Sequence, residues 1–298
     1  MENRKERYVN PYTDFGFKKL FGSEENKDLL ISFLNCLLNG RETIWNLTYL
    51  NTEHLGTGED DRKAVFDVYC QNERNEMFLV EMQCGEQQYF KDRSIYYATF
   101  PIREQAPKGR WNYELKAVYV IGILNFTFDD NSDKNCRHTV QLVDMESKTV
   151  FYNKLTFIYL EMPKFNKSED ELDGIFDKWL FVLRNLSRLM ERPRALQERI
   201  FTRLFEAAEI AKFTKKESID YEESLKNYRD WENTIDTAKI KARAEGLAEG
   251  RAEGLAEGRE EGRKEQSIEI ARQMKAKGVL PSAIMEFTGL SEEEISLL

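Results

Sequence analysis

The sequence predicts an α/β fold in which helices flank a mixed β-sheet, followed by an α-helical C-terminal region that contains a long charged helix. The prediction depends on a change of pattern near residue 165. Before that point, segments rich in β-branched and aromatic residues alternate with helical segments, whereas after it the apolar residues follow helical spacing almost throughout. The chain of 298 residues is 41% hydrophobic, which suffices for at least one packed core and excludes a wholly disordered protein.

The first part of the chain alternates between predicted helices and strands. Residues 28–39 are apolar on most of their surface and end at Gly40, which indicates a buried helix with a glycine stop. A second helix is expected over residues 86–102, with Pro101 ending or kinking it. Enrichment in β-branched and aromatic residues predicts strands at residues 43–55, 64–71, 77–84, 115–126, 139–143 and 155–162.

The second part of the chain is predicted to be helical and to divide further. Helical patterns at residues 169–190 and 194–212 follow Ser168, which precedes a run of acidic residues as in a helix N-terminus. We therefore expect four regions: an α/β domain at residues 8–165, a helical region at 166–235 that packs on or near it, a glycine-striped charged helix or linker at 236–266, and a short helical module at 267–298.

Glycines recur every four residues in the charged segment, at Gly246, Gly250, Gly254, Gly258 and Gly262. On a helix of 3.6 residues per turn they form a slowly winding stripe. Each glycine costs about 1 kcal/mol of helix stability relative to alanine, so an isolated helix of this kind is weak. The stretch is therefore either a solvated linker or a rod in which a second helix packs closely on the stripe. The second alternative predicts a homo-oligomer formed through the C-terminal helices.

The last residues of the chain form short helices around a turn. Two predicted helices flank Gly278 and Pro281, and a third begins at Ser291, which forms an S-x-x-E cap with Glu294. The arrangement resembles a helix-turn-helix. The acidic residues at 292–294 make a poor surface for phosphate, so a module for packing or dimerisation is favoured over a DNA reader.

Charge and composition exclude several classes of protein. The chain carries 53 acidic and 44 basic residues, a net charge of -9, so it does not coat nucleic acid by bulk charge. With only two histidines, the sequence excludes most zinc hydrolases and most catalytic triads that use histidine. The four cysteines form no C-x-x-C pair, and no segment has the length of a signal peptide core or a membrane span. We expect a cytoplasmic protein with no membrane partner.

Two acidic residues interrupt apolar strands, Asp67 in the first and Glu81 in the second. An antiparallel pairing in which residue numbers sum to 148 places Asp67 opposite Glu81, with a loop centred on Arg74. In this register both acids and Gln83 lie on one face. The opposite face is apolar and is predicted to be core, with Phe66, Val68, Cys70, Phe78, Val80 and Met82.

These residues suggest a metal site. A buried carboxylate is unfavourable unless it is paired, hydrogen-bonded or bound to a metal. Two carboxylates and the amide oxygen of Gln83 suit Mg²⁺, with Mn²⁺ as a substitute, and such an ion activates water and stabilises charge on a phosphodiester. Considered alone, however, the pair is more often explained by ion pairs with lysine or arginine in a half-exposed sheet.

The acid on one strand followed by E-x-Q on the next resembles the PD-(D/E)XK nuclease superfamily. Within it, the blocks YTDFGFKKLFG (12–22), VEMQ (80–83) and DRSIYY (92–97) resemble the recombination-promoting nuclease and transposase family, over residues 8–190. The resemblance implies a restriction-endonuclease-like sheet at 8–165, with Asp67 and Glu81 as metal ligands. It also places Gln83 where the superfamily usually has lysine. A glutamine orients water but carries no charge, so the metal would have to activate that water.

Further candidates surround this motif. The resemblance implies that Asp14 is an outer metal ligand or completes the site, although Thr13 or Asp14 could instead cap the first helix. Lys18 and Lys19 are either phosphate contacts or solvated helix residues. Residues 88–118 hold six basic and three acidic residues, and within this segment Lys91 and Arg93 are expected to contact DNA phosphates, or in the case of Arg93 to form an ion pair.

Together these features predict a metal-dependent endonuclease that hydrolyses DNA phosphodiester bonds and is linked to recombination or mobile elements. The predicted catalytic residues are Asp14, Asp67, Glu81 and Gln83. The alternative is a nuclease-fold protein with weak or no catalytic activity that acts as a DNA-binding or self-assembling module.

Overall fold

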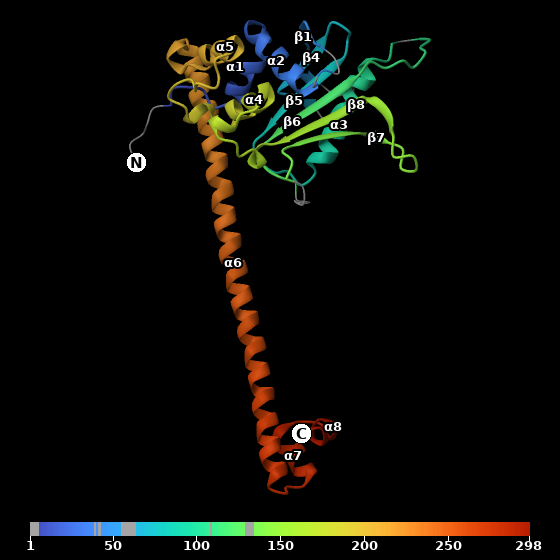
Figure 1. Ribbon diagram of the computed structural model, residues 1–298, viewed down its shortest axis with the longest axis vertical. Coiled ribbons are helices and arrows are strands. Elements are labelled where there is room, and N and C mark those ends of the chain that lie inside the picture. The colour runs from blue at the N-terminus through green and yellow to red at the C-terminus, as the bar shows by residue number, and fades with distance from the viewer. Residues whose placement is uncertain (1–5, 39, 41–42, 55–63, 108, 129–133) are drawn as a thin grey trace. The chain divides into compact units, whose positions relative to one another are not determined.

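The computed structural model describes residues 6–38, 40, 43–54, 64–107, 109–128 and 134–298, and divides into two compact units, one ending at Tyr228 and the other beginning at Arg229. The first unit contains a six-stranded sheet in the order β1-β4-β5-β6-β8-β7 (Figure 1). Its strands are β1 (Leu47–Tyr49), β4 (Val68–Asn72), β5 (Met77–Gln83), β6 (Val118–Leu124), β7 (Arg137–Val143) and β8 (Val150–Glu161). A separate ladder joins β2 (Glu53–His54) to β3 (Ala64–Val65).

The sheet is mixed, as predicted. Strands β5, β6 and β8 run parallel to one another, whereas β1, β4 and β7 pair antiparallel with their neighbours. In the parallel part, Gln83 of β5, Leu124 of β6 and Glu161 of β8 lie in one row across the sheet. The carboxyl ends of these three strands therefore meet along one edge, where Glu81 and Gln83 also lie.

Helices cover both faces of the sheet (Figure 1). One face packs with α1 (Asp14–Phe21), α2 (Lys27–Leu38), α4 (Gly174–Asn185) and α5 (Arg199–Ala208) in the larger core, where Trp179 is fully buried. The other face packs against α3 (Phe90–Glu104), which forms a smaller aromatic core with β5, β6 and β8. Short 3-10 turns connect these elements at Glu24–Asn26, Met162–Lys164, Glu169–Glu171, Leu186–Arg188 and Ile210–Lys212.

The hairpin register predicted from the two acids is confirmed. Val68 pairs with Val80 and Gln71 with Met77, so the paired residue numbers sum to 148. The turn brings Asn75 to a positive φ of 59°, which an asparagine tolerates better than most residues. Because the register holds, the two faces of the hairpin are those that the sequence predicts from Val68 onward.

The prediction for Phe66 was wrong. The strand is interrupted between Val65 and Val68, so the side-chain alternation does not continue through Asp67. Phe66 therefore packs on the α3 side, edge-to-face with Tyr69 at 5.7 Å and with Tyr97 at 5.0 Å between ring centroids. Val68, Cys70, Phe78 and Val80 lie in the core on the opposite face, as expected.

The helix expected over residues 86–102 begins later and ends later. It starts at Phe90 and continues through Pro101 to Glu104, so the proline does not end it. Ser94 on this helix is buried and lies 2.6 Å from the hydroxyl of Tyr159 on β8. The helix is thereby held against the parallel strands close to the row that contains Glu81.

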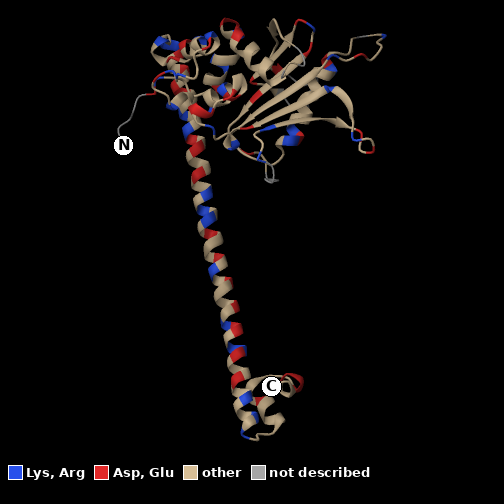
Figure 2. Ribbon diagram, viewed as in Figure 1, with Lys and Arg blue, Asp and Glu red and all other residues tan. Residues whose placement is uncertain are grey.

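A long helix, α6 (Lys215–Ala276), begins in the first unit and continues into the second. Its first turns contact the N-terminal segment: the Tyr221 hydroxyl accepts a hydrogen bond from the Asn10 N–H at 3.1 Å, and the Ser224 hydroxyl accepts one from the Phe15 N–H at 3.1 Å. Residues 236–266 are helical, and Lys, Arg, Asp and Glu alternate along them (Figure 2).

The second unit ends in α7 (Pro281–Thr288) and α8 (Glu292–Ser296), which pack on the end of α6 through Ala271, Ile284 and Ile295. The capping box predicted at Ser291 and Glu294 is confirmed. No helix in the described part of the chain is long and apolar enough to cross a membrane.

The glycine of the YTDFGF block is required by a close backbone approach. Thr13 caps α1 by accepting a hydrogen bond from the Gly16 N–H at 3.0 Å, and a Cβ on Gly16 would lie 2.0 Å from the Asn10 carbonyl oxygen. Gly16→Ala should therefore lower the free energy of unfolding by at least about 2 kcal/mol, measured by urea denaturation.

Gly250→Ala is the control, because nothing lies within 4 Å of the Cβ it would add. Gly250 lies in the second unit, so Gly250→Ala should leave the free energy of unfolding of the first unit unchanged. Equal stability of Gly16→Ala and wild type would contradict the close approach at Asn10.

Candidate active site

The β4–β5 hairpin fixes the two acids against each other through the backbone. The Asp67 N–H donates to Glu81 Oε1 at 3.3 Å, and the Met82 N–H donates to Asp67 Oδ2 at 2.7 Å. Each carboxylate is thus held by a peptide group of the opposite segment. Among the described residues no hydrogen bond reaches Asp67 Oδ1 or Glu81 Oε2, so one oxygen of each acid is left for a ligand.

Both acids lie in an environment that disfavours their charge. Glu81 is only 8% exposed, and burial together with the adjacent Asp67 raises its pKa to about 8. Burial also raises the pKa of Asp67, and the Met82 N–H partly opposes that rise. Without a cation, the pair therefore tends to retain a proton at neutral pH.

The pair has the donor chemistry of a hard divalent cation. A buried and a half-buried carboxylate side by side need a compensating positive charge, and Mg²⁺ is commonly bound by one or two carboxylates that leave positions for water and phosphate oxygens. The described residues contain no cluster of three or more His, Cys, Asp and Glu side chains that could hold a metal. A metal here would accordingly take Asp67 and Glu81 as its carboxylate ligands and complete its shell with water or phosphate.

Gln83 lies beside the pair, but its amide is already engaged. Its Oε1 accepts a hydrogen bond from a terminal nitrogen of Arg93, and its Nε2 donates to the Gly85 carbonyl at 3.0 Å. The amide oxygen predicted as a third oxygen for the metal is therefore directed to a guanidinium. Arg93 itself favours ionisation of both acids and so lowers the pKa of Asp67 and of Glu81.

Two charged residues of α1 act electrostatically on the acids. Because Thr13 is the helix cap, Asp14 is free of that role and forms an ion pair with Lys18 at 2.7 Å. The charge of Asp14 raises the pKa of Asp67, whereas Lys18 lowers the pKa of both acids. Direct contacts thus join Asp14 to Lys18, the segments of Asp67 and Glu81 to each other, and Gln83 to Arg93.

Lys19 and Lys91 have other partners. Lys19 forms an ion pair with Glu217 of α6 at 2.6 Å, which lowers the pKa of Glu217 to about 2. Lys91 is exposed and lies over the ring of Phe128, 4.6 Å from its centroid. Their contacts with DNA remain predictions.

Sequence reasoning missed two neighbours of the acids, Tyr97 and Gly122. Tyr97 lies under Arg93, 5.4 Å from guanidinium carbon to ring centroid, and both acids contribute to the rise of its pKa after burial. Gly122 pairs with Glu81 in the sheet, and a Cβ there would lie 3.1 Å from the Tyr159 ring. A single glycine inside an apolar strand is the signal that indicates such a close approach.

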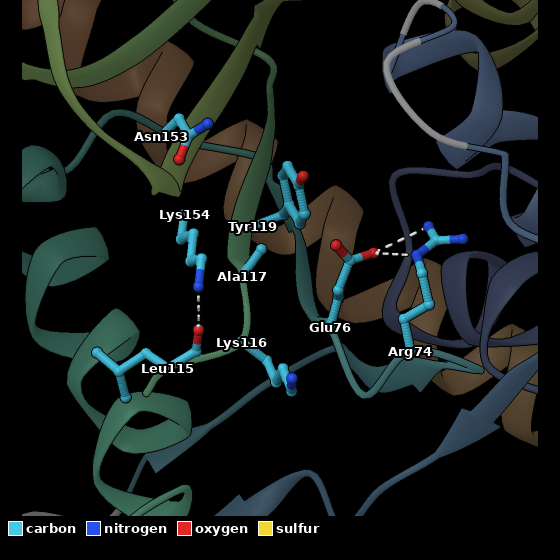
Figure 3. A pocket seen from close by; sticks show the side chains of 8 residues that line it. All are labelled: Arg74, Glu76, Leu115, Lys116, Ala117, Tyr119, Asn153 and Lys154. Carbon is cyan, nitrogen blue, oxygen red and sulfur yellow. Dashed lines mark hydrogen bonds and ion pairs between the residues drawn. The ribbon is translucent and has the colours of Figure 1, made fainter. Parts of the chain in front are cut away.

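A hollow of about 310 Å³ lies at the opposite end of β5 and β6 (Figure 3). Its charges are largely balanced within the protein: Arg74 pairs with Glu76 at 2.9 Å, and Lys116 pairs with Glu114 at 3.1 Å. Lys154 donates to the Leu115 carbonyl at 2.9 Å. We therefore place the candidate active site at the acid pair and not in this hollow.

Comparison with known families assigns two parts of the chain. A family model described as PD-(D/E)XK nuclease family transposase matches residues 11–238, which include the acid pair, α1 and α3. A second, described as the C-terminal HTH domain of the Rpn/YhgA-like nuclease family, matches residues 264–298. The second match supports the helix-turn-helix interpretation of the last helices over the packing module that their acidic residues favoured. No curated protein and no solved structure matches the chain.

Glu81→Gln should change how stability depends on pH. In the metal-free fold the carboxyl holds its proton up to about pH 8, against a usual value of 4.5. Its stabilising contribution is complete below pH 4.5 and is lost as the pH rises through 8. In the Glu81→Gln variant the side chain at this position is a neutral amide that does not ionise, so this loss of stability does not occur.

The gap in free energy of unfolding between the variant and wild type should therefore widen by up to about 4 kcal/mol between pH 5 and pH 9, since one pKa unit is worth about 1.4 kcal/mol. Urea titrations in EDTA measure this gap. The exposed Asp92→Asn is the control, and a gap for Glu81→Gln that is as constant as the control's would contradict the buried pair.

Proposed function

The chain belongs to the PD-(D/E)XK nuclease family transposases, and on that premise we propose that it is a metal-dependent endonuclease that hydrolyses DNA phosphodiester bonds. The observation that carries the proposal is the contact between Asp67 and Glu81, in which each acid is fixed by a backbone N–H and keeps one oxygen for a ligand. Mg²⁺ is the proposed cofactor, with Mn²⁺ as a substitute.

The roles of the surrounding residues follow from their positions. Asp67 and Glu81 would hold the metal, which when bound supplies an activated water and stabilises charge on the phosphate. Gln83 presents its remaining amide N–H beside the pair. Lys18 provides a positive charge near both acids for the DNA backbone, and Asp14 holds Lys18 in place through their ion pair.

The wider biological role is also a proposal. The C-terminal HTH domain would contribute DNA binding to a chain whose net charge of -9 does not favour it, and the family description supports a link to mobile elements. All four cysteines are free thiols, which suits the reducing cytoplasm.

We further propose that α6 mediates self-association. Ile240, Leu247 and Leu255 are more than half exposed although they are large and apolar, and with Ala244 and Arg251 they follow steps of four, three, four and four residues. Such steps approximate an eleven-residue repeat, which keeps a stripe nearly straight along a helix. A second copy of the same helix would cover it, and the glycines would allow close approach.

The alternative function is a nuclease-fold protein with little or no activity that binds DNA or self-assembles. The specific observation in its favour is Gln83, which lacks the charge and proton-transfer capacity of the lysine usual in the superfamily. Metal-independent association with DNA, without cleavage, would support this alternative.

Cleavage of supercoiled plasmid by the full chain with Mg²⁺ or Mn²⁺ tests the enzyme. Asp67→Asn and Glu81→Gln keep the shape of the side chains and should each lower the rate at least about 100-fold, and EDTA should abolish cleavage. Asp92→Asn, which removes an exposed carboxylate from α3, should cleave as wild type does.

A parallel assay on single-stranded RNA separates a DNA enzyme from an RNA enzyme. Folded wild-type protein that cleaves nothing with either metal would favour the alternative function. Cleavage that survives Glu81→Gln would show that the active site lies elsewhere.

Light scattering on the full chain tests self-association. Wild type should elute as a dimer, and the double variant Leu247→Asp with Leu255→Asp should elute as a monomer because each charge would be buried against the second copy. The melting temperature of the first unit should not change. A monomeric wild type at micromolar concentration would contradict the proposal.

A further inference from the structure

We propose that Arg93 supplies, through Gln83, the fixed positive charge that a lysine supplies in the superfamily motif. Arg93 is on this view a positioning residue of the acid site and not primarily a contact for DNA phosphate. The inference rests on the proposed nuclease function and adds how the site works without the lysine.

Direct hydrogen bonds join Arg93 to the motif. One terminal nitrogen of its guanidinium donates to Gln83 Oε1, and the other donates to Gln87 Oε1. Because a guanidinium has only donors, it determines which way the Gln83 amide faces: the oxygen toward Arg93 and the nitrogen toward the Gly85 carbonyl. Arg93 therefore fixes the orientation of the side chain that replaces the lysine.

Two aromatic rings hold the guanidinium in place. Its central carbon lies 5.2 Å from the ring centroid of Phe90 and 5.4 Å from that of Tyr97, both on α3. Phe90 is 5% exposed, so this support is part of the core. A side chain held by two glutamines and two rings loses little further freedom during the reaction, which is the condition for a preorganised charge.

The hydrogen bond to Gln83 brings the charge of Arg93 to the motif. Gln83 lies two residues after Glu81 on β5, so both side chains are on the same face of the strand. On α1, Lys18 is already paired with Asp14 at 2.7 Å. Arg93 forms no ion pair with a carboxylate of the described residues, so its charge is the less compensated of the two.

Arg93 supplies the positive charge that lysine would bring to the motif, but it does not supply the capacity of lysine to transfer a proton. An arginine stays protonated at any ordinary pH, so it stabilises negative charge that develops on the phosphate but does not transfer a proton. The two glutamines use two of the five N–H donors of the guanidinium, so fewer remain for a phosphate.

Steady-state cleavage by four variants tests the proposal: Arg93→Gln, Arg93→Lys, Gln83→Lys with Arg93→Gln, and the control Arg103→Gln on the same helix. Arg93→Gln should lower kcat at least about 30-fold while KM for DNA changes less than about threefold. Arg93→Lys should retain part of the activity. Arg103→Gln, which removes an exposed charge, should leave kcat unchanged.

The double variant Gln83→Lys with Arg93→Gln decides the test, because it moves the positive charge from α3 to position 83, where the superfamily usually has lysine. It should recover at least about tenfold in kcat over Arg93→Gln alone. Each variant should keep a metal-induced rise in melting temperature, which Glu81→Gln should lack, so that loss of folding or of metal binding is distinguished from loss of the charge.

Three results would overturn the inference. Unchanged kcat in Arg93→Gln would show that the charge is not used, and a raised KM with no rescue by Gln83→Lys would show that Arg93 is a phosphate contact. Both leave the nuclease proposal intact, because wild type is active in each. An inactive wild type with both metals would overturn the nuclease proposal together with this one.

Discussion

The site depends on the register of one β-hairpin. The paired residue numbers of β4 and β5 sum to 148, and Asp67 stands directly before the first pair, Val68 with Val80. The strand is interrupted there, and each acid receives a backbone N–H of the other segment. A shift of the register by one residue would move Glu81 relative to Asp67 and break these contacts. Burial raises the pKa of both acids and leaves a demand for positive charge.

Three sources of positive charge compensate the negative charge of Asp67 and Glu81, each in a different way. The charges of Arg93 on α3 and of Lys18 on α1 each lower the pKa of Glu81, and a divalent cation would bind the two acids directly. Fixed side chains alone leave the pKa of Glu81 at about 8, so they do not compensate the burial fully. The remaining imbalance is what makes the pair better suited to a metal than to a structural ion pair.

The sequence predicted the features that depend on the local periodicity of apolar residues. It missed the contacts that depend on packing between elements distant in the chain. The register of the hairpin follows from strand alternation and loop length, and was predictable. Phe66 was misplaced because the interruption at Asp67 leaves no signal in an apolar run. The link between Arg93 and Gln83, and the pairing of Lys19 with Glu217 almost 200 residues away, require the placement of α3 and α6, which no local pattern specifies.

The first turns of α6 bear on where a catalytic fragment of this protein could end. The Tyr221 and Ser224 hydroxyls hold the backbone that leads into α1, and Glu217 holds Lys19. A proteolytic cut just before this helix would spare every residue of the acid pair yet remove these three contacts to the segment that carries Asp14 and Lys18. A fragment that keeps them extends past Ser224, well beyond the last strand of the sheet, even though no catalytic side chain has been placed there.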